Sequence, residues 1–494
     1  MIVAGAYAPF VALALGFSLA VAGCPLVAFP IPVFDDVDAG ADANVELDAG
    51  ADAAPVGCVA AIDCDDGNPC TDESCEGGAC ASTLTAASTA CADADLCNGA
   101  EACNGLGQCA SGAPVVVDDG DPCTADACDP ATGTPTHTKL ITCGWTTTAA
   151  ASAPSARQRH TAVWTGSKMI VWGGSVTAAP SVTATGGVYD PATDTWTPTS
   201  TTNAPLARHS HRAVWTGSKM IVWGGFGAAS YEGTGGIYDP ASDTWTTMSI
   251  VGAPSGRTEL AMVWADNALV VWGGFNGSVL GSGAVYTPQS DTWAALPTAG
   301  SPTPRLAPTG VWTGARAIFW GGNDLFNWHD DGAELTPGTP SLWSTTTDIV
   351  GAPGPREGHT ALWTGKQMLI WGGWNGGPYQ NDGAAFDPAT DADGTWSTIN
   401  LTGAPSPRTE HTAVWTESAM MVWGGCGGDA CVTLLGDGGV WTPGAAGGAW
   451  KAITDTAVIT PRLRHTAVWT GKEMIVWGGK VKSGITATGA RFAP

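Results

Sequence analysis

The sequence has few basic residues, and almost none of them lie in its first third. It holds 20 Lys and Arg against 45 Asp and Glu among 494 residues, and no basic residue precedes Lys139. Residues 1–143 therefore form a polyanionic segment, which argues against binding to nucleic acid or to an anionic membrane surface. The segment 144–494 is closer to neutral, so the acidity belongs to the N-terminal part of the chain.

Two further kinds of pattern are missing. No stretch after Gly144 places apolar residues at a sustained 3.6-residue period, so a helical solenoid is excluded. The chain also lacks a Ser-His-Asp arrangement, a phosphate-binding loop and a helical metal-binding motif. We therefore predict no catalytic residue, and the sequence favours a protein that is not an enzyme.

What the chain does contain is a repeat that ends in Trp-Gly-Gly. The motif follows a short apolar run each time, at Trp172, Trp223, Trp272, Trp320, Trp371, Trp423 and Trp477. A period of about fifty residues built from short β-rich runs predicts a propeller.

One unit of the repeat predicts four strands. The first run ends at Trp164, the second is the apolar run Met169–Trp172, the third ends at Asp190-Pro191, and the fourth centres on Trp196. The last unit stops at Pro494 without a fourth strand, whereas Trp145 lies in a strand-like run with no blade before it. The simplest reconciliation is that Trp145 completes the last blade and closes the ring.

The landmarks of the unit, in order, resemble those of the kelch repeat family. They are an Arg-x-x-His lead-in, a paired glycine, an aromatic-Asp-Pro step and a closing Trp, and they recur over residues 144–494. The resemblance implies an all-β, seven-bladed kelch-type propeller with one four-stranded sheet per blade, closed here by an N-terminal strand. Members of that family are often protein-interaction scaffolds, and some frame an enzyme such as galactose oxidase or a sialic-acid mutarotase.

Three tryptophans recur in each unit, on the first, second and fourth strands. Such large rings can fill the wedges between radially arranged sheets. Carbohydrate-stacking platforms are the alternative interpretation.

The first 23 residues carry no charge and lead to Cys24. This resembles a bacterial lipoprotein signal, which implies that residues 1–23 are removed and that Cys24 is lipidated. The usual basic start is missing, so a cleaved secretory signal or an uncleaved anchor are the alternatives. Residues 24–57 are rich in Ala, Asp and Gly, and we expect an acidic, disordered tether.

Residues 58–143 hold 12 of the 15 cysteines, an even set that predicts a small disulfide-rich module rather than a zinc site. Two aligned segments, around Cys64–Cys75 and Asp118–Asp129, resemble the CTDC-type extracellular cysteine repeat. Candidate Ca²⁺ ligands here are Asp65, Asp66, Asp119 and Asp121, but the alternating spacing of a calcium loop is absent, which favours solvated turns. Beyond this possible Ca²⁺, no cofactor is expected. Cys426 and Cys431 predict a separate disulfide in a propeller loop.

The lead-in arginines are the strongest candidate for chemistry in the ring. The ligand candidates among them are Arg157, Arg208, Arg356 and Arg408, with histidines three residues later in most units. If the first strands line the axis, an Arg and His belt near one mouth of the channel would suit a carboxylate or sulfate. The alternative, which the recurrence in every unit favours, is that these side chains bridge neighbouring blades. Leu260 and Pro308 break the histidine pattern, and such breaks are better clues to function.

A second candidate site is the irregular loop Asn323–Asp331. We single out Trp328, His329 and Asp330 there, with Trp374 and Tyr379 from the equivalent loop of the next unit. Loops on a rigid scaffold are where ligand contacts usually lie.

These observations predict a monomeric protein of the bacterial cell envelope, either lipid-anchored or secreted. It would contact the membrane only through the lipid, and its propeller would bind protein or glycan. The alternative is a carbohydrate-active enzyme on the same propeller, such as an oxidase, a mutarotase or a sialidase-like protein.

Overall fold

The structure is a computed structural model that describes residues 57–91, 95–118, 124–139, 144–177, 181–338, 341–345, 350–389, 394–453 and 458–494. The predicted signal, Cys24 and all but the last residue of the predicted tether lie outside the described residues, as do Asp119 and Asp121. The chain divides into two compact units, one of Met1–Thr89 with Cys103–Gln108 and one of Ala90–Ala102 with Cys109–Pro494.

Disulfides dominate the described part of the first unit. It contains a 3₁₀ turn, η1 (Ala61–Cys64), and a hairpin of β1 (Thr71–Glu76) and β2 (Ala79–Leu84) whose residues are almost all at least partly exposed. Three bridges join Cys58 to Cys75, Cys64 to Cys80 and Cys70 to Cys103. The bridges therefore replace the apolar core that so short a segment lacks.

The second unit begins with short elements and two more bridges, Cys91–Cys109 and Cys97–Cys128. Two short strands lie at β3 (Ala102–Cys103) and β4 (Cys109–Ala110). A hairpin then pairs β5 (Thr124–Asp129) with β6 (Thr134–Lys139).

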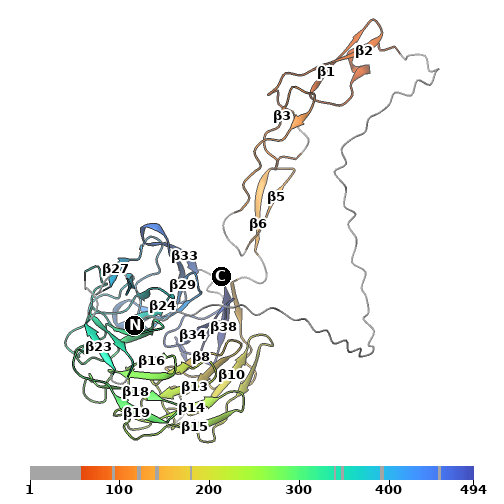
Figure 1. Cartoon of the computed structure of the whole chain (residues 1–494). Coiled ribbons are helices and arrows are strands. Elements are labelled where there is room, and N and C mark those ends of the chain that lie inside the picture. The colour runs from red at the N-terminus through yellow and green to blue at the C-terminus, as the bar shows by residue number, and fades with distance from the viewer. Residues whose placement is uncertain are drawn as a thin grey trace, which may run out of the picture. The chain divides into compact units, whose positions relative to one another are not determined.

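Seven four-stranded antiparallel sheets make up the rest of the second unit, as predicted (Figure 1). Blade 1 is β8 (Thr161–Trp164), β9 (Met169–Trp172), β10 (Gly186–Asp190) and β11 (Thr195–Pro198). Blade 2 is β12 (Arg212–Trp215), β13 (Met220–Trp223), β14 (Gly235–Asp239) and β15 (Thr244–Thr247). Blade 3 is β16 (Ala261–Ala265), β17 (Ala268–Trp272), β18 (Gly283–Thr287) and β19 (Thr292–Ala295). Blade 4 is β20 (Thr309–Trp312), β21 (Ala317–Trp320), β22 (Gly332–Thr336) and β23 (Leu342–Thr345).

Blade 5 is β24 (Thr360–Trp363), β25 (Met368–Trp371), β26 (Gly383–Asp387) and β27 (Thr395–Thr398). Blade 6 is β28 (Thr412–Trp415), β29 (Met420–Trp423), β32 (Gly438–Thr442) and β33 (Ala449–Ile453). Blade 7 is β34 (Thr466–Trp469), β35 (Met474–Trp477), β38 (Gly489–Ala493) and β7 (Gly144–Thr147). The loops between the second and third strands of blades 6 and 7 contain small strands, which are β30 (Cys426–Gly427), β31 (Thr433–Leu434), β36 (Lys480–Val481) and β37 (Gly484–Ile485). Short 3₁₀ turns lie at η2 (Asp429–Cys431) and η3 (Ala445–Gly447).

The ring closes as the sequence predicts. Strand β7 pairs with β38, with Trp145 opposite Phe492, so the N-terminal strand is the outer strand of blade 7. Each first strand contacts the first strands of both adjacent blades, and β34 contacts β8. Blade 7 is thereby completed by strands from both ends of the propeller, so the pairing of β38 with β7 fastens the ring.

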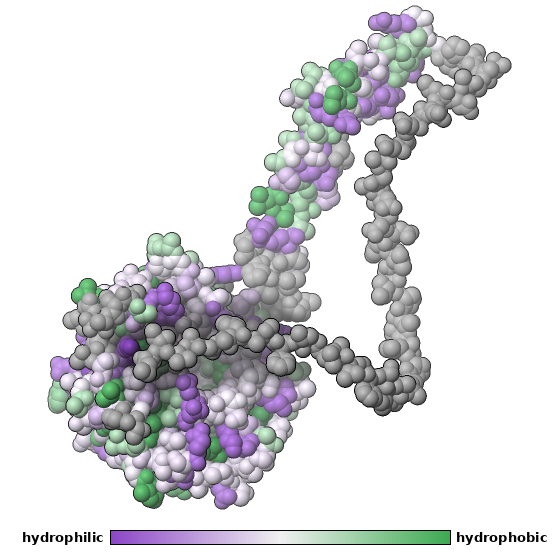
Figure 2. All heavy atoms as spheres, in the orientation of Figure 1, coloured by the Kyte–Doolittle hydropathy of each residue, from purple (hydrophilic) through white to green (hydrophobic). Residues whose placement is uncertain are grey.

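The core lies between the blades rather than at one centre. The second strands are buried along their length except at Ala268, and their tryptophans are at most 1% exposed. Each hydrophobic cluster joins residues of adjacent blades, as Trp172 and Ile170 of blade 1 do with Val222 and Trp245 of blade 2. On the outside, hydrophilic and hydrophobic residues are interspersed over the visible face of the propeller (Figure 2).

The paired glycines are required by backbone geometry. Gly173 and Gly174 have φ of 69° and 110°, a region that favours glycine. A Cβ on Gly173 would collide with the His211 ring of the next blade, and one on Gly174 with the Cβ of His160. The motif therefore marks where two blades approach most closely.

Candidate functional site

The seven lead-in arginines are structural donors inside their own blades. Each is at most 1% exposed. Arg157 donates from Nε to the Ser155 carbonyl, and its Nη1 lies 3.0 Å from the carbonyl of Gly173 and 2.7 Å from that of Thr185. Its Nη2 donates to two hydroxyls, so all five N–H groups are used. Burial lowers the pKa of Arg157 to about 10, which still leaves it charged at neutral pH.

The same contacts recur at the other predicted ligand arginines. The Nη1 atoms of Arg208, Arg356 and Arg408 donate to the first glycine of the Trp-Gly-Gly motif in the same blade. These bonds favour the structural interpretation, because the guanidinium groups have little capacity left for a ligand.

The histidines three residues later form a belt of contacts between blades. Five of them place Nε2 next to a threonine hydroxyl at the start of the preceding blade. The pairs are His160–Thr466, His211–Thr161, His359–Thr309, His411–Thr360 and His465–Thr412, at 2.8–3.3 Å. Burial, and then the charge of the adjacent lead-in arginine, lowers the pKa of His160 and His411 to about 3. These lowered pKa values keep the histidines of the belt neutral at physiological pH, which favours the structural interpretation of the belt.

Where the histidine is replaced, its threonine partner is replaced as well. Leu260 and Pro308 stand at the histidine position of blades 3 and 4, and the partner positions in the preceding blades hold Arg212 and Ala261. Leu260 is fully buried in the core between blades 2 and 3. Position 212 thus has no histidine to bond, and it carries an exposed arginine whose Nε instead reaches the next blade and donates to the Leu260 carbonyl at 3.0 Å.

A ring of non-repeating side chains lies directly above this belt. It is formed by the residue two places after each lead-in arginine, and every member has a positive φ between 50° and 63°. The members are Arg159, Ser210, Glu259, Ala307, Gly358, Glu410 and Arg464. Backbone bonds link neighbours, as Arg159 N donates to Arg464 O and Ser210 N to Arg159 O. Backbone geometry is constant around the ring whereas side-chain chemistry varies, which is the arrangement expected of a recognition surface on a rigid scaffold.

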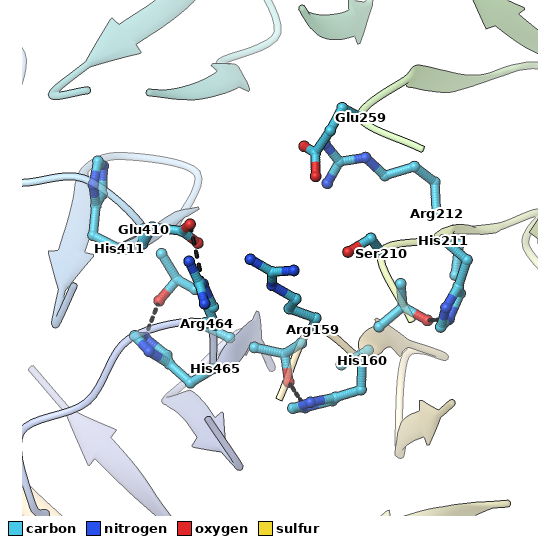
Figure 3. Close-up of a pocket in the computed structure, with 16 residues that line it drawn as sticks. Arg159, His160, Ser210, His211, Arg212, Glu259, Glu410, His411, Arg464 and His465 are labelled. Carbon is cyan, nitrogen blue, oxygen red and sulfur yellow. Dashed lines mark hydrogen bonds and ion pairs between the residues drawn. The ribbon is translucent and has the colours of Figure 1, made fainter. Parts of the chain in front are cut away.

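Five members of this ring, Arg159, Ser210, Glu259, Glu410 and Arg464, line a cavity of about 390 Å³ at the mouth of the channel, together with Arg212 (Figure 3). Arg464 Nε lies 3.1 Å from Glu410 Oε1, so these two charges are paired. Figure 3 shows Arg159 extending into the cavity and Arg212 extending towards Glu259. Among the residues that the structure describes, Arg159 has no ion-pair partner within 4 Å. Burial, and then the charges of Arg159 and Arg464, lower the pKa of the adjacent His209.

The predicted loop residues Trp328 and Trp374 do come together. Their rings meet edge to face at 5.3 Å, and the Trp328 indole lies against Gly376. Trp328 Nε1 lies 3.4 Å from Glu357 Oε1, and Asn323 donates to the other oxygen of that carboxylate. Burial is the main cause of the raised pKa of Glu357. Trp328 therefore clamps the loops of blades 4 and 5 to each other.

The remaining predicted residues, Tyr379, His329 and Asp330, lie outside this contact between Trp328 and Trp374. Trp374 and Tyr379 line a second cavity of about 430 Å³, with Pro407 and Ala430 on its far side. The Nε2 atom of His329 lies 3.7 Å from Asp324 Oδ2, and burial lowers its pKa. Asp330 lines neither cavity. A disulfide joins Cys426 to Cys431 beside the second cavity.

The mouth residues were not singled out from the sequence. Arg159, Glu259, Glu410 and Arg464 occupy a position without a shared residue type, so the repeat does not mark them, and Arg212 replaces the threonine that recurs at its position. The signal that finds them is a comparison of equivalent positions for departures from the repeat.

In the disulfide-rich part, Asp65 and Asp66 lie close to Glu73, with ligand atoms within 4.8 Å of one another. Asp65 Oδ1 accepts from Gly67 N, and Asp66 Oδ1 accepts from Asn68 N at 2.8 Å. Both carboxylates thus stabilise a turn of their own chain segment. The Ca²⁺ interpretation stays a prediction.

Comparisons with known proteins agree with the repeat. A family model described as the KLHDC2/KLHL20/DRC7 Kelch-repeats domain matches residues 134–322 and 309–485. Adagio-like protein 3 of Oryza sativa subsp. japonica is 31% identical over 140 residues, which cover 28% of this chain and 22% of that protein. The chain thus spans much less than two thirds of the length of this relative. Within the described residues, no helix has the length and apolar character to cross a membrane.

Proposed function

Because the chain belongs to the kelch-repeat family, whose propellers commonly bind proteins, we propose that it is a binding scaffold of the bacterial cell envelope. In this proposal the channel mouth recognises an anionic segment of a partner protein. The carrying observation is the arrangement of Arg159, Ser210 and Arg212 around one cavity, with Arg159 unpaired. A guanidinium that protrudes into a partly enclosed cavity suits a carboxylate, because the pair forms two parallel charge-assisted hydrogen bonds.

The glutamates of the mouth would set the selectivity. Glu259 and Glu410 line the same cavity, and Glu410 is paired with Arg464. A partner with several adjacent charges would meet repulsion from these carboxylates, whereas a single carboxylate near Arg159 would not. We therefore expect recognition of an isolated acidic side chain or chain terminus rather than a polyanion.

Peptide arrays would test this function. The full chain is probed against peptides that carry one Asp or Glu and against the same peptides with Asn or Gln. The Arg159→Gln/Arg212→Gln variant is expected to lose binding by at least about tenfold, since one charge-assisted pair contributes roughly 1.5–3 kcal/mol. Lys472→Gln is the matched control, because it removes an exposed positive charge from another blade end. Equal binding by both variants would contradict the proposal.

The envelope location rests on the sequence of the N-terminal segment. We propose that Cys24 is lipidated, that residues 24–57 act as a tether and that the disulfides reflect an oxidising compartment. Labelling with radioactive palmitate compares the natural chain with Cys24→Ala. Equal incorporation by the two would remove the anchor from the proposal.

The enzyme alternative finds less support at this mouth. It needs a convergent pair of carboxylates or tyrosines, but Glu410 is engaged by Arg464. Tyr189, Tyr238 and Tyr286 each donate a hydrogen bond to an aspartate five residues later, at 2.6–2.7 Å. Burial and that hydrogen bond raise the pKa of these phenols further above neutrality. The geometry therefore favours binding over catalysis.

A further inference from the structure

The three recurring tryptophans differ in exposure. The second-strand set is at most 1% exposed, whereas all seven first-strand tryptophans are only partly buried. The first-strand ring lies at the end of the strand, while the residues at its start line the channel mouth. Each first strand rises about 3.3 Å per residue, so these indoles lie at the opposite end of the blades from the mouth.

Two grooves between adjacent blades contain these tryptophans. One groove, of about 450 Å³, lies between blades 1 and 2 and is lined by Trp215. The other, of about 420 Å³, lies between blades 2 and 3 and is lined by Trp264. We call them the 1–2 groove and the 2–3 groove.

The two grooves are copies of each other in the repeat. In addition to its tryptophan, each is lined by a threonine and a lysine from the turn after the first strand, a threonine of the fourth strand and a proline after the third. These residues are Thr165, Lys168, Thr197 and Pro240 in the 1–2 groove and Thr216, Lys219, Thr246 and Pro288 in the 2–3 groove. Ser218 lines both. One binding geometry is therefore presented twice.

The chemistry of the grooves selects a neutral, hydroxyl-rich ligand. Lys168 Nζ lies 3.4 Å from Asp190 Oδ2, and Lys219 Nζ lies 3.4 Å from Asp239 Oδ2. Because a carboxylate of the same blade offsets each ammonium, the groove has little attraction for an anion. Each groove is also lined by a carboxylate, Asp243 in the 1–2 groove and Asp266 in the 2–3 groove. The partly exposed indole, the ammonium N–H donors, the carboxylate and the hydroxyls together match the apolar face and the hydroxyl edge of a pyranose ring.

We propose that the 1–2 and 2–3 grooves each bind one pyranose unit of a neutral glycan. Trp215 and Trp264 would stack on the sugar ring, and the lysines and hydroxyls would bond its hydroxyl groups. Two equivalent sites on one rigid frame would engage a polymer with higher avidity than a single sugar. This inference is independent of the channel-mouth proposal, since the two involve opposite ends of the blades and different residues.

The boundary between blades 3 and 4 supplies a matched control. The positions of the lysine and the fourth-strand threonine hold Ala268 and Ala294 there, so the polar half of the site is missing. The first-strand tryptophan is still present as Trp312, and its Nε1 donates to Asp266 at 3.0 Å. Trp312→Ala therefore removes an equivalent indole that lines neither groove, but it also takes the hydrogen-bond donor from Asp266, which lines the 2–3 groove, so it is matched most closely to Trp215→Ala in the 1–2 groove.

Saturation-transfer NMR and an immobilised-glycan assay would test the proposal on the full, disulfide-intact chain. The probes are hexasaccharides of α-linked glucose, β-linked glucose, mannose and N-acetylglucosamine. At least one probe is expected to bind. Trp215→Ala and Trp264→Ala should each reduce binding to the immobilised probe, the double variant should reduce it by at least about tenfold, and Trp312→Ala should leave it within twofold.

Far-UV circular dichroism and thermal unfolding establish that each variant is folded. Should a tryptophan variant fail to fold, Thr197→Ala/Thr246→Ala takes its place, because it removes only exposed hydroxyls from the two grooves. Absence of binding to all four probes overturns the proposal, as does binding that survives in the double variant. Arg159→Gln/Arg212→Gln should bind the sugar normally, so failure here is distinguishable from failure of the channel-mouth proposal.

Discussion

The Nε2 atom of His160 lies 2.9 Å from the Oγ1 atom of Thr466, and this contact joins the first strand of blade 1 to that of blade 7 where the ring closes. It is one of five equivalent contacts, and each joins a histidine to the threonine of the preceding blade. At the two boundaries without the histidine, the threonine is also missing. The chain thus changes both partners together, which avoids leaving a buried polar atom without a bond.

A double-mutant cycle would measure this pairing. Thr466→Val should lower the free energy of unfolding by about 1–3 kcal/mol, because the buried His160 Nε2 loses its partner. His160→Leu/Thr466→Val removes both partners of the contact and should cost less than His160→Leu and Thr466→Val added together. Urea unfolding monitored by tryptophan fluorescence provides the free energies. Strict additivity would show that the contact adds nothing.

Stability should also fall in mild acid because of the same histidines. Burial holds the pKa of His160 and His411 at about 3, whereas the unfolded chain titrates near 6.5. Below pH 6.5 the unfolded state takes up more protons than the folded state. Each such histidine therefore removes about 1.4 kcal/mol per pH unit as the pH falls from 6.5 towards the folded pKa.

Thermal unfolding between pH 8 and pH 4.8 would test this effect. The melting temperature is expected to be nearly constant above pH 7 and to fall steeply below pH 6.5. His411→Leu/Thr360→Ala should be less stable at pH 8 but should have a shallower slope, because one titrating group is gone. A melting temperature that stays constant down to pH 5 would refute the idea that the buried histidines lower stability in acid.

The fold could be predicted in detail because packing and sequence share one period. Trp172 and its counterparts occupy the same buried wedge in every blade, so each copy of the motif reports one blade. Ring closure could be predicted because the run around Trp145 is a strand with no blade before it, while the last repeat ends after the strand of Phe492 and has no fourth strand. The structure pairs these two residues.

The site was predicted less well, for a physical reason. Repetition marks residues such as Arg157 that every blade needs, and the structure shows that its N–H groups serve the blade itself. Arg159 lies two positions away, at a position where every blade has the same left-handed backbone conformation. Because different residue types adopt this conformation there, the repeat shows no common residue at the position. The residues of the channel mouth are therefore found only after equivalent positions have been compared.

Substitution of Arg157 should therefore lower the stability of the fold much more than substitution of Arg159. Arg157→Lys leaves several buried carbonyls without a donor, because an ammonium cannot reproduce the guanidinium fork, and it should cost about 2–4 kcal/mol of stability. Arg159→Gln should change stability by less than about 0.5 kcal/mol, because the side chain bonds to no other described residue. Chemical unfolding of both variants beside the natural chain would show the difference. A large loss of stability in Arg159→Gln would mean that the mouth arginines are structural as well.

Trp145 offers a test of ring closure that does not alter the repeats. Its side chain is 6% exposed, and its ring lies 5.1 Å from those of Trp423 and Phe492. Trp145→Ala should lower the free energy of unfolding by about 3–5 kcal/mol, because it leaves a cavity between blades 6 and 7. Trp245→Ala, in the fourth strand of blade 2, removes an equivalent ring that is 4% exposed from a blade whose strands are continuous in sequence. Both variants lose similar packing, but only Trp145→Ala weakens the attachment of a strand that is distant in the chain. The rate of amide hydrogen exchange should therefore rise selectively in β7 and β38 for Trp145→Ala. An equal rise in all seven blades would show that the pairing of β7 with β38 does not open independently of the other blades.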